Sequence, residues 1–149
     1  MRQTNISNLI LFLLLCIGSL NSACVSIADL PPDVRGTFVS NREATIEKWR
    51  REEPFGHETE KMIEVLGGTL GRTTAVLDSN SITLRMGDSE QVDILRRVSL
   101  QDGVIHLRYH SNIYGRVLQS RIVPDADGFW VYSDEILVGF SERFDRVRP

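Results

Sequence analysis

The sequence contains little cysteine and no hydrophobic run of transmembrane length. Among its 149 residues, only Cys16 and Cys24 are cysteines, and Cys16 lies within the apolar run Leu9–Leu20. That run is shorter than the roughly 20 residues that a membrane-spanning helix needs. If it is removed on export, at most one cysteine remains, and a disulfide within the chain is excluded.

Motifs of nucleophilic and phosphate-binding sites are also missing. The sequence has no Gly-x-Ser-x-Gly motif and no cysteine after Cys24. The glycine-rich stretch 67–71 lacks both the lysine and the preceding strand of a phosphate-binding loop. We interpret it as a helix end followed by the start of a strand. The sequence therefore predicts neither an enzyme nor a bound cofactor.

Positive charge is sparse and scattered. The only lysines are Lys48 and Lys61, and the remaining basic residues are arginines spread along the chain. The formal net charge is −3, and it becomes −4 when Arg2 is removed with the first residues. No dense basic stripe of the kind that binds nucleic acid is present, so we predict no nucleic-acid partner.

The first residues have the order of an export signal. Arg2 precedes the apolar run, and small or polar residues follow it as far as Ala23. A charged start, a short hydrophobic segment and small residues before a cleavage site are typical of a secretory signal peptide. We predict a signal peptide over residues 1–23.

The stretch Leu20-Asn21-Ser22-Ala23-Cys24 resembles the cleavage box of bacterial lipoproteins. The resemblance implies a lipid on Cys24, a tether over residues 24–34, and attachment to a membrane of the cell envelope. Because Val25 follows the cysteine, the resemblance also favours the periplasmic side of the outer membrane. The alternative is cleavage after Ala28, which would release a secreted or periplasmic protein beginning at Asp29.

The remaining residues, 35–149, are predicted to form a single domain rich in β-structure. A short strand at Gly36–Val39 is followed by Ser40 and Glu43, which have the spacing of a helix capping box. Helices are expected over residues 41–52 and 57–66, and the pair Gly67-Gly68 is expected to end the second, because glycine accepts the left-handed backbone of a helix end. Alternating hydrophobicity and turn residues then predict the strands 69–77, 81–86, 91–100, 104–110, 116–123, 129–133 and 140–147.

Short turns between these segments predict antiparallel neighbours. The fold class is therefore α+β, with two short N-terminal helices packed on a meander of about seven or eight strands, either a curved sheet or a barrel. Alternation assigns four residues of the strand 91–100 to one face: Val92, Ile94, Val98 and Leu100.

The opening Gly36-Thr37-Phe38 resembles the first strand of lipocalin-like domains, with Phe38 at the position of their tryptophan. The resemblance implies an up-and-down barrel and a closing arginine near the last strand, either Arg143 or Arg146. The segment 129–132, Phe-Trp-Val-Tyr, is also similar to a late strand of small exported bacterial proteins without an assigned role.

Two polar or aromatic groups are candidate sites. Alternation places His106, Arg108 and His110 on one face of a strand, where the two histidines would bind a metal if Asp93 joined them from the neighbouring strand. The alternative is a solvated outer face.

In the aromatic segment near the C-terminus, Trp130 and Tyr132 share one face, and with Arg108 they are candidate ligand-binding residues. The alternative for the aromatic residues is packing beneath the helices through Trp49 and Phe55.

Together these patterns predict an exported, lipid-anchored, non-enzymatic protein of the cell envelope. It would bind a partner protein or a small apolar ligand. The alternative is a small envelope enzyme or a metal-binding protein that uses His106 and His110. A purely structural role is a third possibility.

Overall fold

The computed structural model describes residues 25–27 and 29–148. The predicted signal peptide 1–23 and the proposed lipid attachment site Cys24 lie outside the described residues. The elements are β1 (Val25–Ile27), η1 (Pro32–Val34), β2 (Gly36–Ser40), α2 (Arg42–Glu52), η2 (Gly56–Glu58), α3 (Thr59–Leu66), β3 (Thr73–Leu77), β4 (Ser81–Met86), β5 (Ser89–Gln101), β6 (Val104–Ser111), β7 (Arg116–Pro124), β8 (Gly128–Tyr132) and β9 (Ser141–Arg146).

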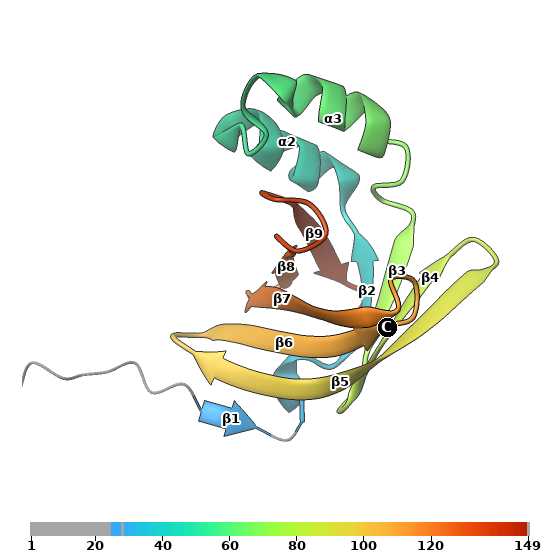
Figure 1. The fold of residues 1–149 in the computed structure, drawn as a ribbon, viewed down its shortest axis with the longest axis vertical. Coiled ribbons are helices and arrows are strands. Elements are labelled where there is room, and N and C mark those ends of the chain that lie inside the picture. Colours follow the sequence, from blue (N-terminus) through green and yellow to red (C-terminus); the bar gives the residue numbers. More distant parts are fainter. Residues whose placement is uncertain (1–24, 28, 149) are drawn as a thin grey trace, which may run out of the picture.

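The strands form one antiparallel sheet that closes into a barrel (Figure 1). Neighbouring strands follow the order β5-β4-β3-β2-β9-β8-β7-β6, and the pairing of β6 with β5 completes the ring of eight. Strand β1 is added outside this ring, where it pairs with the last residues of β5. The predicted antiparallel meander is confirmed, and the choice between a curved sheet and a barrel is decided in favour of the barrel.

Strand β5 corrects the predicted alternation. The pairing of β5 with β6 is irregular between Leu95 and Arg97, so one extra residue is accommodated there. An extra residue reverses which face the following side chains occupy. Val98 is buried whereas Val92 and Ile94 are exposed, so the prediction that these residues share one face was wrong.

One end of the barrel is closed by the segment that precedes β2. The side chains of Leu30 and Val34 are buried against Phe38 in the main hydrophobic core. The guanidinium of Arg146 lies 4.6 Å from the centre of the Phe38 ring and donates hydrogen bonds to the carbonyls of Asp33 and Arg35. This part of segment 24–34 belongs to the fold, where the sequence predicted a tether.

The two helices lie together at the other end of the barrel, between β2 and β3 (Figure 1). Trp49 of α2 is fully buried, and its indole N–H donates to the carbonyl of Ser141 in β9 at 2.8 Å. Its ring packs edge-on against Phe55 and Phe140. These contacts form a second hydrophobic cluster, which fixes the helices on the barrel.

The helix ends differ from the prediction in detail. Asn41, rather than Ser40, caps α2, because its side-chain oxygen accepts from the amide of Ala44 at 2.9 Å. The helix α3 ends at Gly67 as predicted, but Gly67 has ordinary right-handed backbone and neither it nor Gly68 has a positive φ, so the left-handed conformation expected there was wrong. The following strand also begins later than predicted, at Thr73.

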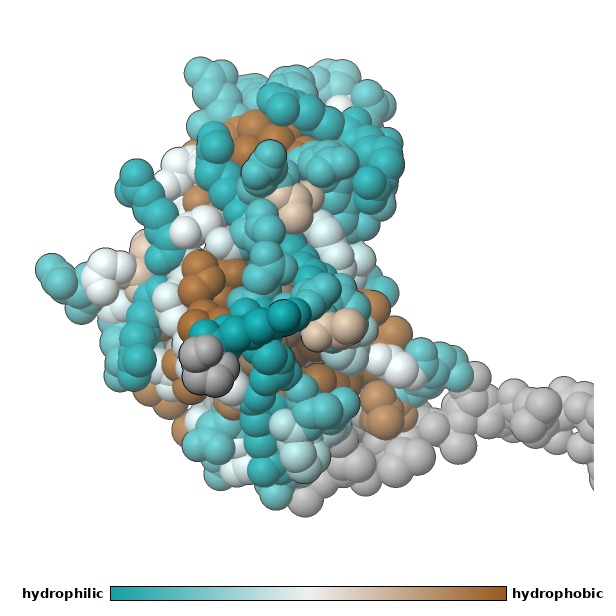
Figure 2. Space-filling view, turned by 180° about the vertical axis from the view of Figure 1, so that it is seen from behind, coloured by the Kyte–Doolittle hydropathy of each residue, from teal (hydrophilic) through white to brown (hydrophobic). Residues whose placement is uncertain are grey.

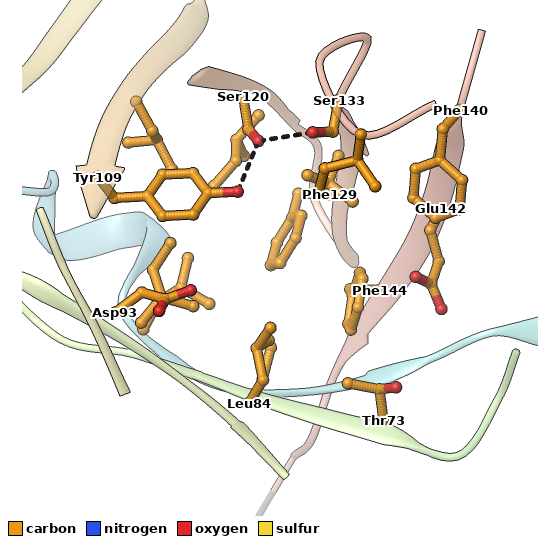
Figure 3. A pocket seen from close by; sticks show the side chains of 17 residues that line it. Thr73, Leu84, Asp93, Tyr109, Ser120, Phe129, Ser133, Phe140, Glu142 and Phe144 are labelled. Carbon is orange, nitrogen blue, oxygen red and sulfur yellow. Dashed lines mark hydrogen bonds between the residues drawn. The ribbon is translucent and has the colours of Figure 1, made fainter. Parts of the chain in front are cut away.

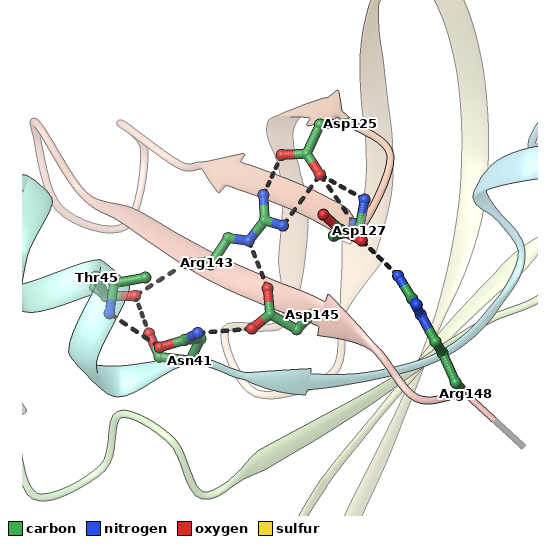
Figure 4. Close-up of polar contacts among 9 residues, drawn as sticks. Asn41, Thr45, Asp125, Asp127, Arg143, Asp145 and Arg148 are labelled. Atoms are coloured by element: carbon green, nitrogen blue, oxygen red, sulfur yellow. Dashed lines mark hydrogen bonds and ion pairs between the residues drawn. The ribbon is translucent and has the colours of Figure 1, made fainter.

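An ionic network joins the β7–β8 turn to β9 (Figure 4). Arg143 is only 8 % exposed, and its guanidinium donates two hydrogen bonds to Asp125 and one to Asp145 at 2.7 Å. Asn41 of the α2 cap donates to the same Asp145. A buried charge is thus matched by two carboxylates, which is the arrangement that makes burial of an ion tolerable.

On the face shown in Figure 2, hydrophilic residues dominate and hydrophobic residues form separate patches. No helix in the described part of the chain combines the length and the hydrophobicity that crossing a membrane requires.

Candidate functional site

The interior of the barrel contains a cavity of about 220 Å³ (Figure 3). It lies between the closed end and the helical end, and inward-facing side chains of β3 to β9 and of the β8–β9 loop line it. Most of these side chains are apolar: Ala75, Leu77, Ile82, Leu84, Leu107, Ile122, Phe129, Val131, Ile136, Phe140 and Phe144. The cavity is therefore suited to a mainly apolar guest.

The apolar wall nearest the closed end is built from aromatic rings. Phe129 stacks on Phe144 with ring centres 5.3 Å apart, and Phe38 meets Phe129 edge-on at 4.8 Å. These rings come from the consecutive strands β8 and β9 and from β2, which pairs with β9 from the other end of the chain. The stack gives the cavity a rigid apolar wall.

A chain of hydroxyl groups runs along another wall of the cavity. The hydroxyl of Tyr109 lies 3.1 Å from that of Ser120, which in turn donates to Ser133 at 3.3 Å. Burial raises the pKa of the Tyr109 phenol, so this group remains a neutral donor and acceptor. These hydroxyls can hydrogen-bond to a polar group of a guest.

Asp93 places a carboxyl group in the cavity wall. Its side chain points inward from β5 and the residue is only 3 % exposed. The side-chain amide of Gln91 donates to both carboxylate oxygens, at 2.7 and 2.8 Å, and the amide N–H of Asn112 donates at 3.3 Å. No ion pair joins Asp93 to a basic residue in the described part of the chain.

Glu142 places a second carboxyl group in the wall, on the opposite side of the cavity from Asp93 (Figure 3). The hydroxyl of Ser40 donates to this carboxyl and accepts from the amide of Gly71 at 2.8 Å. Burial raises the pKa of Glu142, and the hydrogen bond from Ser40 offsets part of that effect. Burial therefore favours the neutral form of Glu142 more than water would.

The predicted ligand-binding residues lie elsewhere. Trp130 alternates with the cavity-lining Phe129 and Val131 along β8, so it lies on the outer face together with Tyr132. The ammonium group of Lys48 lies 5.2 Å from the Trp130 ring and 5.7 Å from the Tyr132 ring. These aromatic residues support α2 from outside the barrel, and they do not line the cavity.

Arg108 and the two histidines also lie on the outer face of the barrel. Arg108 is exposed, and along β6 it alternates with buried residues such as Leu107. The partners of His106 across the sheet are Ser99 and Arg121, and the partners of His110 are Ile94 and Val117.

The predicted metal site also needed Asp93, and the structure does not bring it to the histidines. Asp93 points into the barrel, whereas His106 and His110 are on the outside. Among the described residues, no group of three or more His, Cys, Asp or Glu is placed to hold a metal ion. Two imidazoles on one strand fall short of the three or four ligands of a protein zinc site.

Comparisons of the chain with protein-family models, with curated proteins and with solved structures found no match. The candidate site therefore rests on the geometry of the cavity.

Sequence reasoning did not single out Glu142, and it assigned Asp93 to the metal site with the histidines instead of to the cavity. Glu142 lies two residues from Phe140 and two from Phe144, so strand alternation alone places it on their inner face. Asp93 gave no such signal, because the irregularity after Leu95 made the alternation of β5 point to the wrong face.

Proposed function

We propose that this protein binds a small, mainly apolar molecule in the cavity of its barrel, and that it does so without catalysing a reaction. The observation that carries this proposal is the cavity itself, about 220 Å³ in volume and lined mostly by apolar side chains with a few polar groups. Such a combination is typical of ligand sites. The volume lies below the roughly 300–1,000 Å³ of sites for drug-sized ligands, which favours a smaller guest.

The barrel is also consistent with the lipocalin-like resemblance. Of the two candidate closing arginines, Arg146 packs on Phe38 at the closed end, whereas Arg143 belongs to the ionic network. Membership of that family remains part of the proposal. The alternative of a metal-binding protein that uses His106 and His110 has less support, because no carboxylate converges on them in the described part of the chain.

The binding proposal can be tested by filling the cavity. Ala75 is buried in the cavity wall, and leucine at this position would occupy part of the volume. Hexan-1-ol serves as the probe, and the methyl NMR signals of Leu84, Leu107 and Ile122 serve as the readout. We expect saturable shifts of these signals in the wild type and their loss in Ala75→Leu.

The control is Thr74→Leu, which adds a similar side chain on the neighbouring residue that does not line the cavity. This variant should bind as the wild type does. Absence of saturable shifts in the wild type with hexan-1-ol, hexylamine and hexanoate alike would overturn the proposal.

We also propose that the protein works in the cell envelope, held to a membrane by a lipid on Cys24. Strand β1 begins at Val25, which pairs with Leu100 beside the β5–β6 turn at the closed end of the barrel. A lipid on the preceding residue would therefore direct the closed end toward the membrane and the helical end away from it.

Mass spectrometry of the mature N-terminus tests the anchor directly. We expect an acylated Cys24 in the wild type, and we expect Cys24→Ala to leave the membrane fraction. A mature chain that begins at Asp29 would show that ordinary cleavage after Ala28 removes Cys24, and the lipid anchor would then be ruled out. An intact chain of 149 residues in the cytosol would overturn both export and anchoring.

A further inference from the structure

We propose that the guest of the cavity is a small apolar amine, bound as an ammonium ion with Asp93 as its counterion. This inference rests on the proposed binding function and specifies the chemical class of the ligand. It is carried by the charges in the cavity wall and by the partners that those charges have.

The described residues of the cavity wall include acidic side chains and no basic ones. Two acidic residues, Asp93 and Glu142, line it, and none of the described residues that line it is a lysine, arginine or histidine. Within a medium of low dielectric constant, like charges repel strongly and opposite charges attract strongly. The wall therefore opposes a carboxylate guest and favours a cationic one.

The hydrogen bonds of Asp93 leave room for another donor. A carboxylate has about four acceptor sites, and a single Gln91 nitrogen provides the hydrogen bonds to both oxygens of Asp93. The other donor, the amide N–H of Asn112, reaches only Oδ1, so among the described residues Oδ2 accepts from Gln91 alone. An ammonium group carries N–H donors and a positive charge, and it would supply both missing interactions.

The ionic network around Arg143 shows what a buried charge with a structural role looks like in the same protein. Arg143 is buried and pairs with two carboxylates, Asp125 and Asp145. Asp93 is buried more deeply, yet no basic residue in the described part of the chain lies within ion-pair distance of it. Burying a charged group without a counterion costs free energy. A bound cationic ligand would supply the counterion that Asp93 lacks among the described residues.

The remaining walls match the hydrocarbon part of such a guest. In Figure 3, Leu84, Phe129 and Phe144 lie between Asp93 on one side and Glu142 on the other. The carboxyl of Glu142 already accepts a hydrogen bond from Ser40, and burial raises its pKa, so Asp93 is the stronger candidate for the counterion. An amine bound at Asp93 would thus have its hydrocarbon chain against the aromatic wall.

Three probes with the same six-carbon chain separate charge from shape: hexylamine, hexan-1-ol and hexanoate. Their affinities for the mature protein are measured by isothermal titration calorimetry at pH 7 in phosphate, which contains no competing amine. We expect hexylamine to bind at least about tenfold more tightly than hexan-1-ol, because an ionic hydrogen bond is stronger than a neutral one. Hexanoate should bind most weakly.

Two substitutions then locate the effect. Asp93→Asn should remove the preference for hexylamine while hexan-1-ol still binds. Glu64→Gln removes one negative charge from an exposed position on α3, outside the cavity, and should change nothing. Should Asp93→Asn not fold, the comparison of the three probes on the wild type decides the proposal by itself.

The failures are distinguishable. If hexan-1-ol binds as tightly as hexylamine or more tightly, the amine proposal is overturned and the binding function stands. If Asp93→Asn folds and keeps the amine preference, Asp93 is not the counterion and the proposal is equally overturned. If none of the three probes binds, the binding function itself fails.

Discussion

Two acidic residues inside the barrel, Asp93 and Glu142, differ from the acidic residues on its surface. Asp125 and Glu60 pair with arginines, and those contacts lower the pKa of each carboxyl. Glu142 has only the hydroxyl of Ser40, and burial raises its pKa. A carboxyl whose pKa is raised by burial and that lines a cavity is a candidate for a functional site.

Glu142→Gln should change how stability depends on pH. The folded-state pKa of Glu142 is raised above its ordinary value of 4.5, so the folded state prefers the protonated acid. Its contribution to stability is therefore complete below pH 4.5 and is lost as the pH rises through the raised pKa. Urea unfolding between pH 4 and 8 should show the wild type losing stability relative to Glu142→Gln. If the unfolding free energies of the wild type and of Glu142→Gln depend on pH in the same way, the raised pKa of Glu142 is contradicted.

Asp125→Asn should have the opposite dependence on pH. The hydrogen bonds from Arg143 lower the pKa of Asp125, so its contribution is present at neutral pH and is lost as the pH falls through the folded-state pKa. We expect a loss of about 1 kcal/mol at pH 7, since the carboxylate is half exposed and solvent weakens the pair.

Thermal or urea unfolding at pH 7 and at pH 2 measures this difference, which should shrink at the lower pH. The control is Asp127→Asn, which breaks the exposed pair with Arg148 and should cost little. If both variants lose the same unfolding free energy, the network around Arg143 contributes no more to stability than an exposed ion pair does.

At the scale of the elements, local sequence patterns predicted the ends of the strands well, but they did not predict which side chains of β5 face the interior. The strands 81–86 and 116–123 appear within one residue of their predicted ends. Alternation and turn residues depend only on neighbours in the chain, which is why these ends could be read from the sequence. The inner face of β5 could not be predicted from the sequence, because the irregular pairing of β5 with β6 depends on the partner strand.

The β8–β9 loop depends on Gly139. Its φ of +83° is in the left-handed region, and a Cβ there would lie 2.8 Å from the carbonyl oxygen of Pro54. Gly103 in the β5–β6 turn has a similar φ of +77°, but a Cβ at that position would meet nothing within 4 Å. Both glycines therefore need a left-handed backbone, but only Gly139 lies so close to another part of the chain that a Cβ would clash.

Gly139→Ala should destabilise the protein more than Gly103→Ala does. Alanine in the left-handed conformation lowers the free energy of unfolding by about 1 kcal/mol in both variants. In Gly139→Ala the loop must in addition move away from Pro54. Because Ile136 and Phe140 of that loop line the cavity, hexan-1-ol binding should weaken as well. Equal unfolding free energies of the two variants, measured in urea, would contradict the role of the close approach.

At the scale of the whole molecule, the barrel depends on contacts between its two chain ends. Phe38 pairs with Arg146, and Leu30 and Val34 fill the end beside them. Arg146 fastens this closure through two backbone carbonyls and the Phe38 ring. The aromatic cavity wall of Phe129 and Phe144 belongs to the same hydrophobic core as this closed end.

Arg146→Lys should loosen the closed end although it keeps the charge. Lysine lacks the planar fork that donates to two carbonyls while stacking on a ring, so we expect a loss of about 1–2 kcal/mol. Hydrogen exchange should rise most at the amides of Leu30 and Val34, which bond to the carbonyls of Ser79 and Pro31. Arg148→Lys, at an exposed position, is the control and should leave exchange unchanged.

The sequence by itself determined the order of the elements, most of their ends and the antiparallel meander, because alternation, turns and helix stops act between residues close in the chain. Only the tertiary structure decided the rest. The barrel closes through β5–β6 and β2–β9 pairing, the segment before β2 fills its end, Trp130 lies outside, and Asp93 and Glu142 lie on opposite sides of the cavity. These features join residues up to about a hundred positions apart, and no local pattern records which strands meet.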